Sequence, residues 1–571
     1  MLIEAGGDES SISDVPVLAN NLQQGSFDWE YRVEPQPGRA CLGLVDGRCN
    51  WPRGKVLGGS SVLNYMLYVR GNKGDYDGWA ALGNPGWDYQ SVLPYFKKSE
   101  DNKNPYLAQD IHHHGTGGYL TVQEPPWRTP ASVAFIEAGV ELGYENRDCN
   151  GAQQTGFMLP QATIRRGARC SSAKAFLRPI RDRPNLDILL ESQVLKVMIN
   201  RKNNRAKGVI FQKKEKIFKA FAIKEIILSG GTINTPQLLM LSGIGPAQHL
   251  KYHGIPVFSN LPVGQNLMDH YGTFSIAGTF EKKVTLSEHR LLHQYFLPAI
   301  YEYSQNNRGP LTLLGGVEGL AWINTKFANI SADRPDIELH FTSGHLASDS
   351  GTVRAVQGVS DQIYESLYSP LEGRDTFGFL VLLTRPKSKG CIKLKSRNPL
   401  KKPLIEAGYF SDREDIATLV EGMKFCLKLV NTHAFKKLGG KIWSGRKMPG
   451  CKHFDLWSDE YLECTARHYT NTGYHHVGTA KMGPAGDPSA VVDPRLRVHG
   501  ISGLRVVDAS IMPTVPSGNT NAPTIMIGEK VNNYAQSKQS IFKFKSFYFI
   551  FFKHRFVNMN FIDSKYFLSG E

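Results

Sequence analysis

Two stretches near the carboxyl end place polar side chains where acid–base chemistry could take place. His475 and His476 precede a glycine turn at Gly478, and Asn521 precedes Pro523. Histidine has an ordinary pKa near neutral pH, so it is the natural base for removing a hydroxyl proton. An asparagine amide can donate to the same hydroxyl or accept from it, and so orient it. A turn-capping histidine and a helix-capping asparagine are plainer interpretations, and the residues alone leave both open.

A third candidate lies at the amino end. Leu2-Ile3 reads as the end of a buried strand, and it is followed by Glu4 and the glycine pair Gly6-Gly7. The second strand of a dinucleotide-binding βαβ unit ends in this way. In such a unit an acid about 20 residues after a G-x-G-x-x-G turn accepts hydrogen bonds from the ribose hydroxyls. No such turn stands before Glu4 in the printed sequence. These residues raise the question whether the sequence is incomplete at its N-terminus, and the rest of the sequence must answer it.

Two further groups have the residue types of a reactive site without the spacing. The run His112-His113-His114 resembles a metal cluster, but consecutive residues on a loop cannot all face one ion, so we predict no metal site. Cys170 has no neighbouring residues that could form a base and its orienting group. A nucleophilic role is therefore not predicted for this thiol.

Length and composition indicate a globular protein of more than one domain. The chain has 571 residues, which is long for a single domain. Its formal net charge of +15 comes from scattered Lys and Arg with no basic stripe before residue 540, so we do not expect nucleic-acid binding. Eight cysteines are too few for a disulfide scaffold in so long a chain. Cys41 and Cys49 flank a polar loop and could bridge in a secreted protein or remain free thiols.

Neither end of the sequence reads as a membrane span. Met1 leads into a strand rather than a signal peptide, and no apolar run approaches the roughly 18 residues that a span needs. Residues 537–571 are rich in Phe and Lys without helical amphipathicity. This tail reads either as a membrane-surface anchor or as sequence unrelated to the fold.

Three blocks punctuated by glycine or proline must position the candidate residues: 51–71, 224–246 and 474–530. In the second block we predict a strand at 225–228, a turn at Gly230-Gly231, and a helix after Thr235-Pro236. In the third we predict a strand at 504–507, a turn at 508–510, and a helix from Ala522-Pro523. A strand, a glycine turn and a helix N-terminus together make an anion-binding arrangement. Several of them in one chain indicate a nucleotide cofactor lying across a parallel sheet.

Residues 370–410 have a different character. Apolar and polar residues alternate there, with turn signals at Pro386, Gly390 and Pro399, which predicts antiparallel strands. Helices are expected near 411–435. A second, mainly antiparallel region is therefore inserted between parts of the nucleotide-binding fold.

Three segments resemble the signatures of the glucose–methanol–choline (GMC) oxidoreductases. Residues 54–64 (GKVLGGSSVLN) are similar to the first signature of that family, and residues 231–246 to the second. Residues 474–479 (YHHVGT) and 517–523 (SGNTNAP) are similar to its catalytic stretch. The similarity extends from residue 1 to about residue 535 and has the character of the insect glucose dehydrogenase-like members.

The resemblance implies an α/β fold with two domains. One is a discontinuous, Rossmann-like FAD-binding domain, here without its first strand and helix, and the other is an α+β substrate domain on an antiparallel sheet. We assign residues 1–285 mainly to the FAD-binding domain, with substrate-domain insertions, and 286–473 mainly to the substrate domain. Residues 474–536 would be a catalytic segment that returns to the FAD domain, and 537–571 an atypical tail.

The resemblance also implies the roles of individual residues. His475 would be the catalytic base and Asn521 the second active-site residue, with His476 a neighbour in a position usually filled by a small residue or proline. FAD contacts would come from Glu4, Gly58, Gly59, Ser60, Asn64, Val194, Asp508 and Ala509. The turn from Gly58 to Asn64 contains no histidine or cysteine that could tether FAD, so non-covalent binding is expected.

The implied activity is oxidation of the CH–OH group of a sugar or another alcohol. His475 would remove the hydroxyl proton while a hydride moves to the flavin, and electrons would then pass to a quinone-type acceptor. An oxygen-using alcohol oxidase of the same family is one alternative, and a truncated, non-catalytic copy unable to bind FAD is another. The family and the sequon at Asn329 imply secretion, although such sequons are common by chance.

Overall fold

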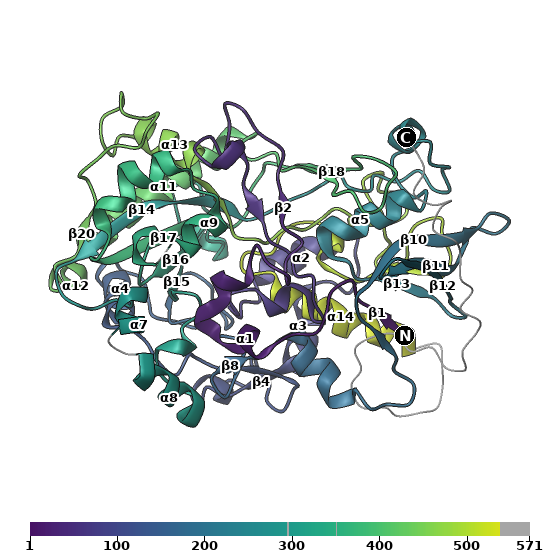
Figure 1. The fold of residues 1–571 in the computed structure, drawn as a ribbon, viewed down its shortest axis with the longest axis horizontal. Helices are drawn as coiled ribbons and strands as arrows, with labels where there is room; N and C mark the ends of the chain where they lie inside the picture. Colours follow the sequence, from purple (N-terminus) through teal and green to yellow (C-terminus); the bar gives the residue numbers. More distant parts are fainter. Residues whose placement is uncertain (294–295, 350, 537–571) are drawn as a thin grey trace.

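The computed structural model describes residues 1–293, 296–349 and 351–536, and the chain folds into two adjoining halves (Figure 1). One half is built on a large antiparallel sheet, and the other on short parallel strand pairs with a three-stranded meander. Long helices lie on the outside of the large sheet, while α14 (Asn521–Gln536) runs through the middle of the molecule beside α3 (Tyr89–Ser99). This arrangement is the mixed α/β fold with a large antiparallel sheet that the sequence predicted.

The large sheet has seven strands, and all its pairings are antiparallel. Helices α4 (Pro130–Glu141) and α11 (Arg413–Val430) pack on it and on each other, which buries an aromatic core that includes Phe135 stacked on Phe341. The strand order is β20 (Lys441–Ile442), β14 (Tyr271–Phe280), β17 (Asp375–Leu383), β16 (Ile337–Thr342), β15 (Val317–Ile323) and β6 (Gly156–Met158), with β21 (Thr470–Thr472) also paired to β14.

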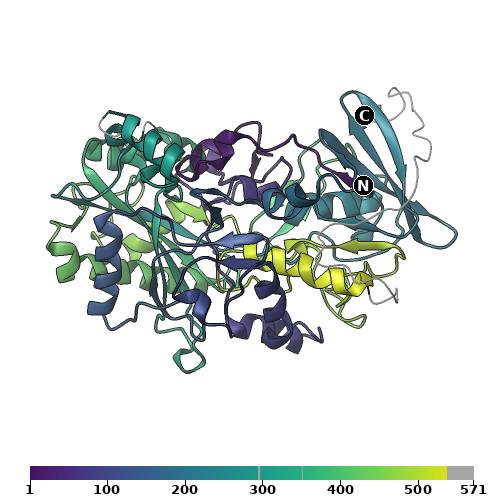
Figure 2. The same cartoon turned by 90° about the horizontal axis from the view of Figure 1, so that it is seen from below.

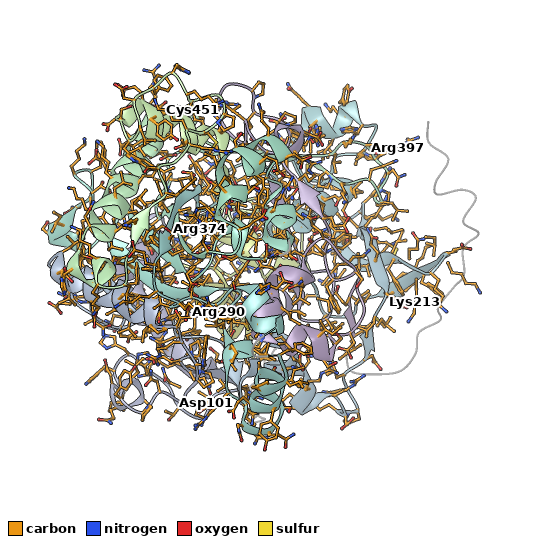
Figure 3. The ribbon with its side chains drawn as sticks, turned by 60° about the vertical axis from the view of Figure 1, so that its left-hand side comes forward. Asp101, Lys213, Arg290, Arg374, Arg397 and Cys451 are labelled. Carbon is orange, nitrogen blue, oxygen red and sulfur yellow. A yellow bond between two sulfur atoms is a disulfide. The ribbon has the colours of Figure 1, made fainter. Side chains whose placement is uncertain are left out.

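The other half contains two separate parallel pairs. β1 (Leu2–Ile3) pairs with β9 (Ile188–Leu189), and β13 (Ile226–Leu228) pairs with β22 (Leu504–Val506). The meander of β10 (Ser192–Asn200), β11 (Arg205–Lys213) and β12 (Lys216–Phe221) projects at one end of the molecule (Figure 2). Lys213 marks this end in Figure 3, and Cys451 lies at the other. The parallel pairs confirm the predicted strands at 225–228 and 504–507.

The antiparallel region predicted for residues 370–410 is confirmed. β17 lies inside the large sheet, while β18 (Cys391–Lys393) and β19 (Leu404–Glu406) form a separate antiparallel pair. The helices expected near 411–435 are α11 and α12 (His433–Lys436). The remaining α-helices include α2 (Lys73–Ala81), α6 (Ala247–Tyr252), α7 (Glu288–His293), α8 (Phe296–Asn306) and α13 (Asp459–His468).

One predicted boundary was wrong: α5 (Gly231–Leu241) begins at Gly231, so Pro236 lies inside the helix rather than in its first turn. A proline inside a helix leaves the carbonyl four residues earlier without its N–H partner. That carbonyl belongs to Thr232, and it accepts a hydrogen bond of 2.6 Å from the Thr479 hydroxyl. A tertiary contact therefore satisfies the helix where its own sequence cannot.

Two disulfides join short loops. Cys41 pairs with Cys49, which settles an alternative that the sequence left open, and Cys451 pairs with Cys464, which the sequence did not predict. Among the described helices none is long and apolar enough to cross a bilayer. The tail at 537–571, with its two interpretations, lies outside the described residues.

Candidate active site

A large cavity of about 3230 Å³ lies between the two halves. This exceeds the roughly 300–1,000 Å³ of an ordinary small-molecule site and leaves room for a long cofactor together with a substrate. All ten residues predicted to form the site line this cavity: Glu4, Gly58, Gly59, Ser60, Asn64, Val194, His475, Asp508, Ala509 and Asn521. They come from segments more than 500 residues apart in the chain, and the fold gathers them around this cavity.

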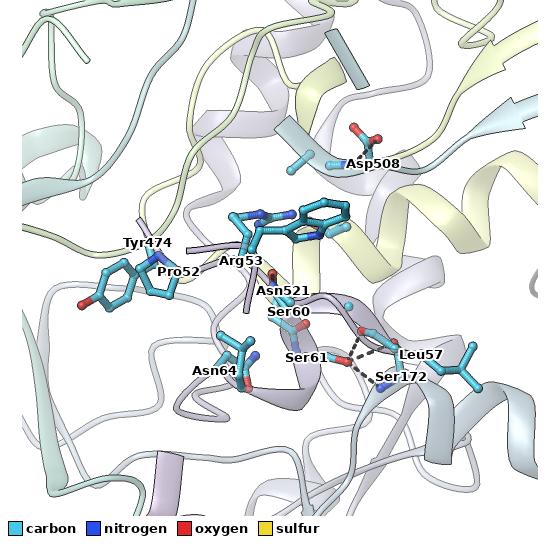
Figure 4. Close-up of a pocket in the computed structure, with 18 of the residues that line it drawn as sticks. Pro52, Arg53, Leu57, Ser60, Ser61, Asn64, Ser172, Tyr474, Asp508 and Asn521 are labelled. Carbon is cyan, nitrogen blue, oxygen red and sulfur yellow. Dashed lines mark hydrogen bonds between the residues drawn. The ribbon is translucent and has the colours of Figure 1, made fainter. Parts of the chain in front are cut away.

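The first glycine turn is held by serine hydroxyls from outside it. Gly58 and Gly59 have φ of 101° and 57°, which favour glycine, and the turn continues into a 3₁₀ helix over Gly59–Val62. Ser61 Oγ donates to the Gly58 carbonyl at 2.7 Å and accepts from the Ser172 N–H at 2.9 Å (Figure 4). The turn is thereby fixed against the wall with its glycine backbone open to the cavity.

Asn64 faces the cavity with its amide oriented by a buried arginine. Its Oδ1 accepts from Arg169 Nη1 at 2.9 Å and from the Met66 N–H at 3.1 Å. No hydrogen bond in the described chain occupies its Nδ2 group, which is therefore free to donate to a ligand.

Glu4 follows β1 and its carboxyl lies in the cavity wall. Oε1 accepts from the Gly6 N–H at 2.8 Å. Burial raises the pKa of this carboxyl to about 7, against the opposing effect of the Gly6 and Ala5 backbone N–H groups and Lys55. Its remaining acceptor capacity suits two neighbouring hydroxyls.

Asp508 lines the cavity, but its carboxylate is engaged by protein groups. Oδ2 accepts from the Gly231 N–H at 2.9 Å and from Thr235 Oγ1 at 2.6 Å, while Oδ1 accepts from Ser510. This residue therefore clamps the second glycine block to the third. Ala509, the next residue, also lines the cavity.

Arg53 is a cavity residue that the sequence reasoning missed, although it stands in the first glycine block. Its Nε is buried without a hydrogen-bond partner among the described residues, and burial lowers the pKa of the guanidinium. The charge lies beside α5: a side chain added at Gly231 would meet Arg53 Nη2 at 2.2 Å. A guanidinium with a buried N–H group that has no partner in the described chain fits a bound anionic cofactor, and Figure 4 shows Arg53 between Pro52 and Asp508.

His475 is buried and lines the same cavity. Its Nδ1 is 3.0 Å from Nδ1 of His270, and its Nε2 is 3.0 Å from Nδ2 of Asn519. Its backbone N–H donates to Asp269 at 2.8 Å. Burial, followed by the neighbouring His270, His340 and His476, holds the pKa of His475 well below its usual value. The ring is therefore neutral near pH 7 and can accept a proton.

The backbone immediately before His475 has an uncommon conformation. Tyr474 has φ of 61°, and its N–H donates to the Thr472 hydroxyl at 2.8 Å. A left-handed conformation at a bulky residue costs free energy and persists where the surroundings fix it, most often at functional sites.

Two asparagines lie near His475, and only one contacts it. Asn521 is the first residue of α14 and lines the cavity, but no hydrogen bond of the described chain joins it to His475. Asn519 makes that contact, and its Oδ1 is buried without a partner in the described chain. The sequence analysis assigned no role to Asn519. Its position two residues before Asn521, in the same motif, was the only signal for a closer role.

The other histidines have structural partners. The His476 ring stacks on Trp51 with ring centroids 3.8 Å apart, as suits a neighbour of the base. His114 is buried between Glu100 and Asp148, whereas His113 contacts Asp110.

The sequence of the chain is similar to those of several characterised dehydrogenases. It is 42% identical over 535 residues to glucose dehydrogenase (FAD, quinone) of Drosophila pseudoobscura pseudoobscura, covering 93% of this chain and 81% of that protein. It is 37% identical over 528 residues to the mitochondrial choline dehydrogenase of Homo sapiens, covering 92% of this chain and 82% of that protein.

Solved structures of oxidases share the fold. The pyridoxine 4-oxidase of Mesorbium loti has a TM-score of 0.78 at 27% identity, covering 94% of each chain. A formate oxidase of Aspergillus oryzae has a TM-score of 0.80 at 27% identity, covering 94% of this chain and 93% of that one. The GMC oxidoreductase N-terminal family model matches residues 15–272 and the C-terminal model residues 386–528. As its sequence predicted, the chain belongs to the GMC oxidoreductase family.

Proposed function

We propose that this protein is an FAD-dependent oxidoreductase that oxidises the CH–OH group of a sugar or another alcohol. The observation that carries this proposal is the neutral His475 imidazole, whose Nε2 and the Asn519 amide lie together in the wall of the cavity. A neutral base beside a hydrogen-bonding amide is the arrangement that removal of a hydroxyl proton requires.

The residues of this chain would act in sequence on the substrate alcohol. The Asn519 amide orients the hydroxyl toward His475, and Nε2 of His475 takes the hydroxyl proton. Asn521, two residues on, lines the same cavity and would contact another part of the substrate or cofactor. FAD, when bound, would supply the acceptor for the hydride from the carbon that carries this hydroxyl.

The cavity offers groups suited to each part of FAD. Glu4 would accept the ribose hydroxyls, and Arg53 would face negative charge on the cofactor. The backbone of Gly58, Gly59 and Ser60 would approach it closely, and the Asn64 amide would donate to the flavin ring. Val194 and Ala509 would contact it through their backbones, while Asp508 holds the turn. Binding would be non-covalent, because the turn at 58–64 contains no histidine or cysteine.

A quinone-type acceptor is the preferred partner in this proposal, since the relatives that are 42% identical are named glucose dehydrogenase (FAD, quinone). Use of oxygen remains the alternative, because a relative that is 35% identical is named oxygen-dependent choline dehydrogenase. A truncated, non-catalytic copy that cannot bind FAD is the second alternative. Secretion is supported by the two disulfides, which persist in oxidising compartments.

The test is reduction of bound FAD by glucose and other alcohols in a stopped-flow spectrometer. His475→Ala should bind FAD normally and lower the rate constant of flavin reduction by about 10²–10⁴-fold, the contribution of a positioned base. His112→Ala is the matched control, because His112 is exposed and remote from the cavity. Equal rates in both variants would exclude His475 as the base, and failure of the native chain to bind FAD would favour the non-catalytic copy.

A further inference from the structure

We propose that His270 is a positioning residue that fixes the tautomer of His475, so that the lone pair of His475 lies on Nε2, next to Asn519. This inference rests on the proposed function, in which Nε2 is the base. His270 precedes β14 and does not line the cavity, so it acts only through His475. The tautomer of His475 follows from which ring nitrogens of His270 and His475 can donate a hydrogen bond.

The protonation state of His270 is set by a carbonyl group. Its Nε2 lies 2.9 Å from the carbonyl oxygen of Thr384, which can only accept, so the proton of His270 is on Nε2. Burial lowers the pKa of His270, so the ring is neutral near pH 7. A neutral ring with its proton on Nε2 carries a lone pair on Nδ1.

That lone pair faces His475. The two Nδ1 atoms are 3.0 Å apart, and a hydrogen bond between them needs one proton, which His475 must supply. The proton of neutral His475 is therefore on Nδ1, and Nε2 keeps its lone pair. The opposite tautomer would place two lone pairs against each other in a buried contact and leave both unsatisfied.

No other group in the described chain competes for His475 Nδ1. Asp269, the nearest carboxylate, accepts from the His475 backbone N–H and from the hydroxyls of Thr472 and Tyr409 rather than from an imidazole of this pair. A side chain added at Gly473 would lie 2.8 Å from His475 Nδ1, so this side of the ring is closely packed.

Charged groups further out do not change this assignment. Glu338, Asp269 and Asp75 favour the charged form of His270, but burial outweighs them. Glu338 is itself hydrogen-bonded to His340 at 2.9 Å. For His475 the facing groups His270, His340 and His476 all act with burial to keep the ring neutral.

The carbonyl at the start of this chain of contacts is rigidly held. Thr384 directly follows β17, its N–H donates to the Asp336 carbonyl at 3.0 Å, and its hydroxyl donates to the Pro335 carbonyl at 2.8 Å. Its orientation is thus fixed by the large sheet. We infer that the sheet of the substrate half sets the basicity of the atom that would act on the substrate.

The direct test is nitrogen-15 NMR of the full chain with labelled histidine, with His475 assigned from the loss of its signals in His475→Ala. The expected result is a proton on Nδ1 of His475 and on Nε2 of His270. A native chain in which His475 carries its proton on Nε2 would overturn the proposal. This readout does not depend on turnover, so it separates the proposal from the proposed function.

Three variants at His270 provide the kinetic test. In His270→Asn an amide oxygen can take the place of Nδ1 and accept from His475, whereas His270→Gln places its amide nearer Thr384 and His270→Ala removes both contacts. The rate constant of flavin reduction should fall by about 10–100-fold in the Ala and Gln variants, the usual effect of losing such an orienting partner. It should stay close to the native value in the Asn variant, with substrate affinity unchanged in all three.

A merely structural role would give a different pattern. If His270 acts only through His475, then His270→Ala should have no further effect on the reduction rate in a His475→Ala background. Equal losses in both backgrounds, or equal rates in the Asn and Gln variants, would overturn the proposal.

Discussion

Burial displaces the pKa values of two ionisable side chains that line the cavity, Glu4 and His475. Burial holds His475 neutral, as a base should be before it acts. Burial also raises the pKa of Glu4 to about 7, which disfavours the ionised form that would accept two ribose hydroxyls. A ligand that needs the carboxylate must therefore work against this shift.

The pKa of Glu4 predicts a pH dependence of cofactor binding. If FAD binds the ionised carboxylate, its affinity should rise with pH and level off above about pH 7. Below that value it should fall by up to about tenfold for each pH unit, as expected for one linked proton. Titration of FAD by fluorescence between pH 5.5 and 8.5 measures this dependence.

Glu4→Gln is the matched control for that titration. It keeps the shape of the side chain, removes the titrating group, and should bind FAD more weakly with a flat profile over the same range. A native profile as flat as that of the variant would show that Glu4 does not hold the ribose.

At the scale of elements, α5 depends on a contact from outside the helix. Pro236 leaves the Thr232 carbonyl without its helical partner, and the buried Thr479 hydroxyl replaces it at 2.6 Å. Gly231, the first residue of the same helix, donates its N–H to the Asp508 carboxylate. The helix that borders the cavity is thus secured by the segment that carries His475.

Thr479→Val should destabilise the protein by about 1–3 kcal/mol, because it leaves a buried carbonyl unpaired while keeping the size of the side chain. Urea unfolding measures the loss. In a Pro236→Ala background the new N–H can satisfy the Thr232 carbonyl, so the same change should cost less there. The same cost in both backgrounds would show that the hydrogen bond is not the cause.

At the scale of the whole molecule, a buried charge network ties distant loops together. His114 contacts Glu100 at 2.9 Å and Asp148 at 2.7 Å, and Arg70 pairs with Glu100 at 2.5 Å. Burial alone would lower the pKa of His114, but the carboxylates of Asp148 and Glu100 outweigh it and raise the pKa to about 9. The network therefore couples stability to pH.

Because the folded chain binds this proton more tightly than the unfolded chain, the contribution of His114 is complete below about pH 6.5. It is lost as the pH rises through about 9. The difference in unfolding free energy between the native chain and His114→Gln should shrink on the order of 3 kcal/mol between pH 6 and pH 10. A constant difference in urea unfolding would refute the assignment.

The sequence by itself determined the elements and residues that short motifs specify. The glycine turn at Gly58-Gly59 and the parallel strands at 226–228 and 504–506 are local in sequence, so spacing and residue type were enough to predict them, whereas the role of His475 was implied by the family resemblance. Glu4 was predicted in the same way, from the strand end that it follows.

Only the tertiary structure decided which groups meet. His270 lies 205 residues from His475, and Thr479 lies 247 residues from Thr232, so no local pattern connects them. The approach of Asn519, rather than Asn521, to His475 and the lack of a hydrogen-bond partner for Arg53 Nε in the described chain also depend on side-chain directions that neighbouring residues do not fix. Hydrogen-bond partners and burial are properties of the packed chain, and these set the pKa values and tautomers on which the proposed chemistry depends.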